Sequence, residues 1–156
     1  KKVCLKVFSE FKGLEHRFEQ VAEINNIKFI NDSKATLVES TVWALNCINS
    51  PVILIAGGRD KGVDYQGILP WVKDKVKEVI LIGEAKEKIK KALNGFLNIS
   101  AAQSLEEAVR MAYEKSAPGD CVLLSQMCSS FDMFSDYEER GRVFKNAVRD
   151  LEKREN

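Results

Sequence analysis

Three short polar segments of the sequence carry the residues best suited to bind an acidic small molecule. The first loop is Asn31-Asp32-Ser33-Lys34-Ala35-Thr36, between a strand-like run and a helical pattern. A helix N-terminus offers free backbone amides and a positive dipole, and both favour an anion. Lys34 and the Thr36 hydroxyl would add donors. Asp32, Ser33 and Thr36 are also common capping residues, so anion binding and plain capping both stay open here.

The second loop, Gly57-Gly58-Arg59-Asp60-Lys61-Gly62, follows an apolar run at 52–56. Glycines allow a backbone to approach a ligand closely, and Lys61 could reach a carboxylate or a phosphate. The loop matches neither G-x-x-x-x-G-K-[ST] nor G-x-G-x-x-G, two patterns of phosphate-binding turns. Taken alone, it predicts an ordinary strand-to-helix turn with a solvated lysine.

The third loop, residues 125–136, holds Ser130 and two phenylalanines, Phe131 and Phe134. Apolar side chains in a polar loop often cover a ligand or a domain interface. The alternative is packing against the core, which we expect for one of the two. Ser130 has no histidine near it in sequence, because His16 is the single histidine of the chain, and a serine hydrolase is therefore not supported.

Strand and helix patterns alternate along the chain and would position these loops. Asn25-Asn26 separates two strand-like runs and predicts a tight hairpin, and His16-Arg17 precedes it without being needed for a strand. The pairs Thr36/Glu39 and Ser104/Glu107 fit capping boxes, and Glu138 lies four residues before Arg142. Strands are expected at 18–24, 27–31, 52–56, 79–82, 97–100 and 121–124, and helices at 36–48, 68–76, 85–93, 104–115 and 137–151.

This order predicts an α/β fold: a Rossmann-like, three-layer domain with a mostly parallel sheet and an N-terminal antiparallel hairpin at its edge. Ligands of open α/β sheets bind beyond the carboxyl ends of the strands, so the three loops should share one edge. We expect the domain to span residues 15–156. Residues 1–14, with a strand-like run at 3–8, are expected to connect it to a preceding domain.

Charge and composition exclude several classes of partner. The 24 Lys and Arg balance 23 Asp and Glu, which leaves a net charge of +1 and no basic field for nucleic acid or a membrane. The chain shows no signal peptide or long apolar span, which favours the cytoplasm. The four cysteines, Cys4, Cys47, Cys121 and Cys128, form no C-x-x-C pair, so we expect buried thiols and no zinc site.

Five strings, in this order, resemble the Mur ligase family. They are H-R-F-E at 16–19, N-D-S-K-A-T at 31–36, G-G-R-D-K-G at 57–62, C-S-S-F-D-M-F at 128–134 and Y-E-E-R-G at 137–141. The second string resembles the D-glutamate-adding members in particular, and the resemblance covers nearly the whole chain. Two features depart from the family: Leu37 stands where members often have Asn, and S-Q-M-C-S-S at 125–130 replaces S-P-A-C-A-S.

The resemblance implies the C-terminal domain of a three-domain, ATP-dependent ligase. Such an enzyme phosphorylates the alanine carboxylate of UDP-N-acetylmuramoyl-L-alanine, and the amine of D-glutamate then attacks the acyl phosphate, in peptidoglycan biosynthesis. ATP and Mg²⁺ would be bound mainly by a central domain outside this chain. The chain alone is expected to be inactive, and the enzyme to be a monomer.

The resemblance also implies roles for individual residues. Thr36, Lys61, Ser130, Phe131 and Tyr137 match positions that bind D-glutamate. Arg17 and Asp32 match positions that meet the nucleotide, His16 and Lys34 match catalytic positions, and no residue matches a metal ligand. Two alternatives stay open: another Mur-type or folylpolyglutamate-type ligase domain, and a stand-alone α/β module that binds an acidic ligand.

Overall fold

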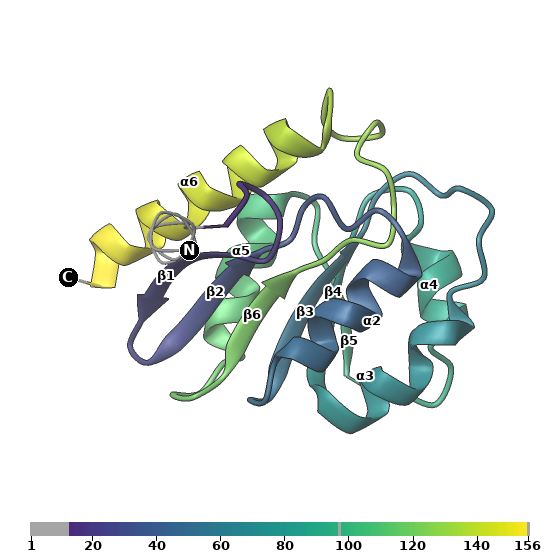
Figure 1. Cartoon of the computed structure of the whole chain (residues 1–156), viewed down its shortest axis with the longest axis horizontal. Coiled ribbons are helices and arrows are strands. Elements are labelled where there is room, and N and C mark those ends of the chain that lie inside the picture. Colours follow the sequence, from purple (N-terminus) through teal and green to yellow (C-terminus); the bar gives the residue numbers. More distant parts are fainter. Residues whose placement is uncertain (1–12, 97, 156) are drawn as a thin grey trace, which may run out of the picture.

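A six-stranded β-sheet runs through the computed structural model, which describes residues 13–96 and 98–155 (Figure 1). Its strand order is β1-β2-β6-β3-β4-β5. The β1 strand is antiparallel to β2, and the other pairs are parallel, as the sequence predicts. The strands are β1 (Glu19–Ile24), β2 (Ile27–Asn31), β3 (Val52–Gly57), β4 (Val76–Ile82), β5 (Ile99–Ala101) and β6 (Cys121–Leu124).

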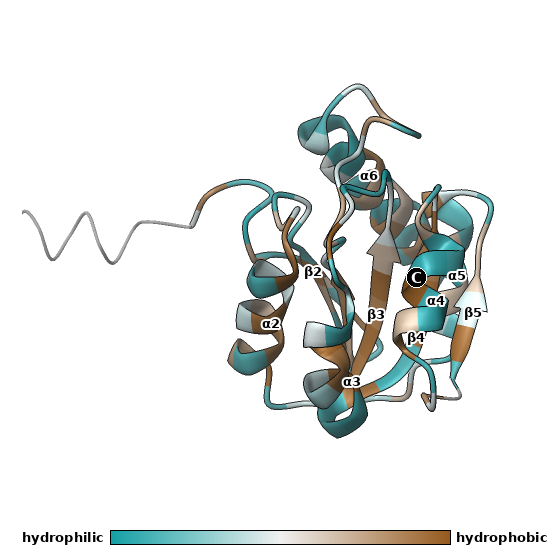
Figure 2. Ribbon diagram, turned by 90° about the vertical axis from the view of Figure 1, so that its right-hand side faces the viewer, coloured by the Kyte–Doolittle hydropathy of each residue, from teal (hydrophilic) through white to brown (hydrophobic). Residues whose placement is uncertain are grey.

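Helices cover both faces of this sheet, which confirms the three layers. They are α2 (Val38–Cys47), α3 (Leu69–Lys75), α4 (Lys86–Ala92), α5 (Leu105–Glu114) and α6 (Tyr137–Glu155), with a 3-10 turn, η1 (Gln66–Ile68), before α3. Helices α2, α3 and α4 pack into one apolar cluster, and α5 and α6 pack into the other. Figure 2 shows α2 and α3 on one side of the sheet and α5 on the other.

The central strand β3 is continuously apolar because both of its faces are buried. Leu54 and Ala56 point into the cluster under α2–α4, whereas Ile53 and Ile55 point into the cluster under α5 and α6. All four side chains are buried. Because side chains alternate between the faces of a strand, a strand covered on both sides needs apolar residues at every position.

The predicted hairpin brings the residues before β1 to the ligand-binding edge. Asn25 and Asn26 adopt positive φ values of 50° and 63°, as a two-residue turn of this hand requires. Glu19, the first residue of β1, pairs with Asn31, the last residue of β2. The segment that precedes Glu19 therefore lies at the carboxyl end of β2.

The two predicted capping boxes have opposite outcomes. Glu107 donates its N–H to Ser104 Oγ at 3.1 Å, so the cap of α5 is confirmed. The Thr36/Glu39 box is wrong: the N-cap of α2 is Leu37, and no described side chain caps it. The reason is a turn within the first loop, in which Thr36 donates its N–H to the Lys34 carbonyl at 2.9 Å, so the helix begins later than expected.

Several other boundaries differ from the sequence prediction. Strand β4 begins at Val76 instead of 79, because Val76 pairs with Val52 of β3. The helix expected at 68–76 is a 3-10 turn followed by α3, with Pro70 in the first turn of α3, where no N–H is needed. Strand β5 lies at Ile99–Ala101, and the strand-like run at 3–8 lies outside the described residues, with most of the expected connector.

Buried cysteines are confirmed at Cys121 and Cys128, whereas Cys47 is exposed at the end of α2, contrary to expectation. Cys4 lies outside the described residues.

Among the helices that the structure describes, none has the length and apolar character needed to cross a membrane.

Candidate functional site

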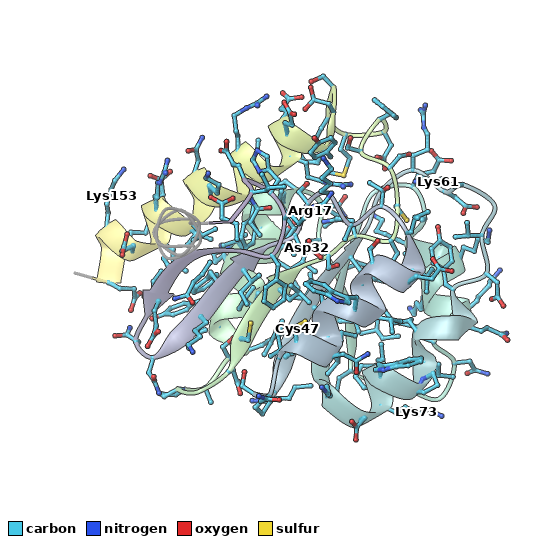
Figure 3. All side chains as sticks on the ribbon, viewed as in Figure 1. Arg17, Asp32, Cys47, Lys61, Lys73 and Lys153 are labelled. Carbon is cyan, nitrogen blue, oxygen red and sulfur yellow. The ribbon has the colours of Figure 1, made fainter. Side chains whose placement is uncertain are left out.

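The three loops predicted to share one edge of the sheet do so. They follow β2, β3 and β6, whose carboxyl ends meet because these strands are parallel neighbours. Arg59 donates its N–H to the Ser129 carbonyl at 2.9 Å, which ties the second loop to the third. Lys61 Nζ donates to the Thr36 carbonyl at 2.9 Å, which ties the second loop to the first. In Figure 3, Arg17, Asp32 and Lys61 lie along this carboxyl edge.

The start of α2 is held by contacts from outside the helix. Asp32 donates its N–H to the Leu124 carbonyl at 2.9 Å, and Lys34 donates its N–H to the His16 carbonyl at 3.0 Å. Because no described side chain caps Leu37, the amides of the first turn stay available beside Thr36. This arrangement suits an anionic group, since the amides and the helix dipole both favour negative charge.

A buried arginine supports the first and third loops from below. Arg140 on α6 is 1% exposed. Its guanidinium donates to Ser33 Oγ at 2.9 Å, to the Ser33 carbonyl at 2.6 Å and to the Cys128 carbonyl at 3.3 Å. Burial lowers the pKa of Arg140 to about 10, so it stays protonated at neutral pH. Arg140 therefore places a fixed positive charge under the site.

The role of Arg140 was not predicted from the sequence, although Arg140 lies in the Y-E-E-R-G string at 137–141. A signal was present: Arg140 lies four and eight residues before Phe144 and Val148, both of which are buried on the inner face of α6. A charged residue on an apolar stripe of a helix is expected to have partners, because burying a charge without hydrogen bonds is costly.

Two lysines lie at the rim of the site. Lys34 is exposed, and its Nζ lies 3.4 Å from Tyr137 Oη and 5.2 Å from the centroid of the Tyr137 ring. Lys61 is exposed as well and reaches the Thr36 carbonyl. The structure thus brings four of the predicted residues together in two pairs. Each ammonium group has further donors that an acidic ligand could use.

The other two predicted substrate residues lie in the third loop. Ser130 is 3% exposed, and its carbonyl accepts the N–H groups of Met133 and Phe134. Phe131 is 61% exposed, whereas Phe134 packs against the apolar cluster under α5 and α6. The expectation that one of the two phenylalanines packs against the core is confirmed. Among the described residues, hydrogen bonds tie Ser130 to its own loop and not to Thr36 or Lys61.

The third loop keeps an anchored backbone at Gln126 and Met127, where its sequence departs from the family string. The Gln126 carbonyl accepts the N–H of Gly57 at 3.0 Å. The Gln126 side chain is fully buried, and its amide atoms make no hydrogen bond to the residues that the structure describes. Met127 follows with a positive φ of 59°.

His16 is buried next to the rim residue Tyr137, and the two rings meet edge to face with centroids 6.3 Å apart. The histidine residue is 4% exposed, and Asn31 Nδ2 lies 2.9 Å from His16 Nδ1. The ring packs on Gly141, where an added Cβ would lie 2.1 Å from His16 Nδ1. These contacts fix the His16 carbonyl, which accepts the N–H of Lys34. In the folded chain His16 therefore helps to hold the first loop, and its catalytic role stays a prediction.

A groove of about 400 Å³ opens beside α2. Two residues assigned to the nucleotide by resemblance, Arg17 and Asp32, line it together with a lysine of the rim. Asp32 accepts hydrogen bonds from the Phe18 N–H at 3.1 Å and from Ser125 Oγ at 3.2 Å. Burial nevertheless raises the pKa of Asp32 to about 6. The lining residues are Arg17, Asp32, Lys34, Ala35, Glu39, Ser40 and Trp43.

Across residues 13–96 and 98–155, no three His, Cys, Asp or Glu side chains lie together as metal ligands. The described residues of the site therefore do not form a Mg²⁺ site by themselves.

The chain matches the family described as "Mur ligase, glutamate ligase domain" over residues 16–126. It is 48% identical over 151 residues to a UDP-N-acetylmuramoylalanine–D-glutamate ligase of Chloroherpeton thalassium, covering 97% of this chain and 32% of that protein. A protein of the same name from Caldicellulosiruptor saccharolyticus is 47% identical over 148 residues, covering 94% of this chain and 33% of that protein. The chain thus spans about a third of the length of these relatives.

Solved structures share the fold at lower identity. A folylpolyglutamate synthase of Thermotoga maritima has a TM-score of 0.61 at 19% identity, covering 99% of this chain and 35% of that chain. The MurF ligase of Thermotoga maritima, in complex with ADP, has a TM-score of 0.57 at 14% identity, covering 91% of this chain and 33% of that chain.

Proposed function

This chain belongs to the Mur ligase family, and we propose that it is the C-terminal, amino-acid-binding domain of a longer enzyme that joins D-glutamate to UDP-N-acetylmuramoyl-L-alanine with ATP. Relatives nearly half identical to it carry the name of that ligase. The observation that carries the proposal is the uncapped start of α2, flanked by Lys34 and Lys61. We place the enzyme in the cytoplasm, as a monomer.

D-Glutamate has two carboxylates, and the site offers two groups of donors for them. The free amides of α2, the Thr36 hydroxyl and the Lys61 ammonium lie where the first and second loops meet. Lys34 and the Tyr137 hydroxyl form the second group. Charge-assisted hydrogen bonds are roughly twice as strong as neutral ones, so paired cations suit a dicarboxylate better than a neutral amino acid.

Ser130 and Phe131 complete the proposed pocket from the third loop. The exposed Phe131 ring would cover the methylene groups of the bound D-glutamate and exclude water. The buried Arg140 charge lies beneath and would favour negative charge above it.

Arg17 and Asp32 are proposed to meet the nucleotide in the groove beside α2. ATP would supply the phosphoryl group that activates the alanine carboxylate for attack. The residues of this chain would orient the D-glutamate amine and hold the groups around it, with His16 and Lys34 fixing the first loop. Because the sequence lacks a G-x-x-x-x-G-K-[ST] pattern, we expect the chain alone to release no phosphate.

Lys61→Ala tests this proposal in a full-length enzyme that contains the chain. Losing a charge-assisted hydrogen bond should lower kcat/KM for D-glutamate by an amount equal to about 1.5–3 kcal/mol of transition-state stabilisation. The KM for ATP should stay within about twofold. Lys73→Ala is the control, since Lys73 on α3 is exposed and lies at the opposite end of the molecule (Figure 3). An unchanged response to D-glutamate with altered ATP use would overturn the assignment of Lys61.

The substrate on which phosphate release depends separates the proposed ligase from the other ligases. Phosphate release that depends on D-glutamate, and not on L-glutamate or meso-diaminopimelate, supports the D-glutamate ligase. Dependence on another amino acid would favour a sister ligase, and folate-dependent release would favour a folylpolyglutamate-type enzyme.

A further inference from the structure

An exposed aromatic side chain, Trp43, lines the groove beside α2, and the proposed function gives it no role. Trp43 lines the groove with Glu39 and Ser40, one turn earlier on the same face of α2. The indole is 57% exposed, so it is not a core side chain. Large exposed aromatic side chains in a hollow of the surface commonly mark a contact with a ligand or a partner.

The indole is held in place from behind. The rings of Phe18 and Trp43 meet edge to face, with centroids 5.6 Å apart and an angle of 77° between the planes. Phe18 adopts a positive φ of 47° and donates its N–H to Asp32 Oδ1. The groove carboxylate therefore fixes the residue that supports the indole. Aromatic pairs of this geometry are favourable, so the indole keeps a defined orientation without being buried.

The chemistry of the groove fits a nucleotide better than an amino acid. The indole offers a flat apolar face for a planar ring. Arg17 and Lys34 offer cations for phosphate oxygens, and Asp32 and Ser40 offer polar atoms for sugar hydroxyl groups. D-Glutamate has no ring to pack against Trp43, whereas the base of a nucleotide does.

We propose that Trp43 forms the wall against which the base of ATP packs, so that α2 of this domain contributes to nucleotide affinity as well as to amino-acid binding. The inference rests on the proposed function, because it takes ATP as the nucleotide. It assigns Phe18 as the positioning residue that supports the indole.

Steady-state kinetics of a full-length enzyme that contains this chain test the inference. Trp43→Ala should raise KM for ATP about five- to tenfold, the lower end of what a stacked base is worth, because the indole is half-exposed. Values of kcat and of KM for D-glutamate should stay within about twofold. Trp43→Phe keeps a stacking face and should restore KM for ATP to within about threefold of wild type.

Trp71→Phe is the matched control. Trp71 lies on α3, outside the groove, and donates its indole N–H to Asn46 Oδ1 at 3.2 Å. This variant should leave KM for ATP unchanged. A Trp43→Ala enzyme with unchanged KM for ATP would overturn the inference. So would an equal loss for D-glutamate, or a lower kcat alone, since Trp43 would then contact another part of the protein.

Calorimetric titration with ATP separates this inference from the proposed function. If the full-length enzyme shows no D-glutamate-dependent phosphate release, the proposed function fails. Weaker ATP binding by Trp43→Ala than by wild type would still support the role of Trp43. If D-glutamate-dependent release is present and both proteins bind ATP equally, the ligase assignment stands and the base-packing role is wrong.

Discussion

Helices α2 and α5 both begin after a parallel strand, and both carry the residues of a capping box, yet only one uses them. At the start of α5, Ser104 Oγ accepts the Glu107 N–H, and the Glu107 carboxylate accepts the Gln103 N–H at 2.7 Å. At the start of α2, no described side chain accepts from the first turn. The α5 junction thus caps a first-turn amide with its own side chain, whereas no described side chain caps the first turn of α2.

Hydrogen bonds from residues distant in sequence hold the α2 junction in place of a local cap. Its backbone is held by His16, Leu124 and Arg140, all distant in sequence. Side chains that are costly to bury collect at the same place, among them Asn31, Asp32, Ser33, Ser125 and Arg140. The difference teaches that a helix start can be stabilised by tertiary contacts and left free of an internal cap, which is the arrangement that the proposed substrate site requires.

Removing the external support should have the largest effect. Arg140→Ala deletes three hydrogen bonds, leaves Ser33 and Cys128 acceptors unpaired and opens a cavity, so it should lower the free energy of unfolding by about 3–5 kcal/mol. Arg110→Ala, on the exposed face of α5, should change it by less than about 0.5 kcal/mol. Urea unfolding of both variants gives the comparison. Equal, small effects would show that Arg140 is not what supports the α2 junction.

A second prediction concerns the pH dependence of the α2 junction. Burial raises the pKa of Asp32 from 3.8 to about 6, so between these values the folded state binds a proton that the unfolded state has lost. The Asp32 contribution to stability therefore falls as pH rises from about 4 to 6 and is constant above. Asp32→Asn removes this loss. The variant should gain up to about 3 kcal/mol relative to wild type between pH 4 and pH 7.

Glu19→Gln provides a control of opposite sign. Burial alone would raise the pKa of Glu19, but hydrogen bonds from the His16 N–H and from Lys145 outweigh it and lower the pKa. The stability that Glu19 contributes is present above its unfolded pKa and is lost as pH falls through the folded pKa. Urea unfolding from pH 3 to pH 7 should therefore show Glu19→Gln losing stability relative to wild type as pH rises. The same pH trend in both variants would refute the assignment for Asp32.

Much of the fold was predictable from the sequence, because local patterns determine it. Strands β3 and β6 are continuously apolar since both faces are covered, and Asn25-Asn26 specifies its turn through positive φ values. The start of β4 was placed three residues late, because Val76-Lys77-Glu78 has the polarity of a surface segment. The pairing of Val76 with Val52 of β3 decides the boundary, and the local sequence carries no sign of it.

The candidate site was predictable in outline and not in detail. Parallel topology alone brings the three loops to one edge, so their proximity follows from the order of the elements, whereas the contact of Lys61 with the Thr36 carbonyl does not. The groove wall was missed, because the position of Trp43 depends on Phe18, which lies before the hairpin. The motif at Thr36 is ambiguous in sequence, since a capping box and an open anion site use the same residue types.

The smallest expected effect tests that ambiguity directly. Ser104→Ala removes a cap that is present, so it should lower the free energy of unfolding by about 1 kcal/mol. Thr36→Ala removes a hydroxyl that caps nothing in the folded chain, so its cost should stay below about 0.5 kcal/mol. In a full-length enzyme the order should reverse: Thr36→Ala should lower kcat/KM for D-glutamate several-fold, and Ser104→Ala should leave it unchanged. Urea unfolding and steady-state kinetics of the two variants decide the matter. If Thr36→Ala is destabilised as much as Ser104→Ala, the Thr36 hydroxyl caps α2 in solution, and the two junctions are alike.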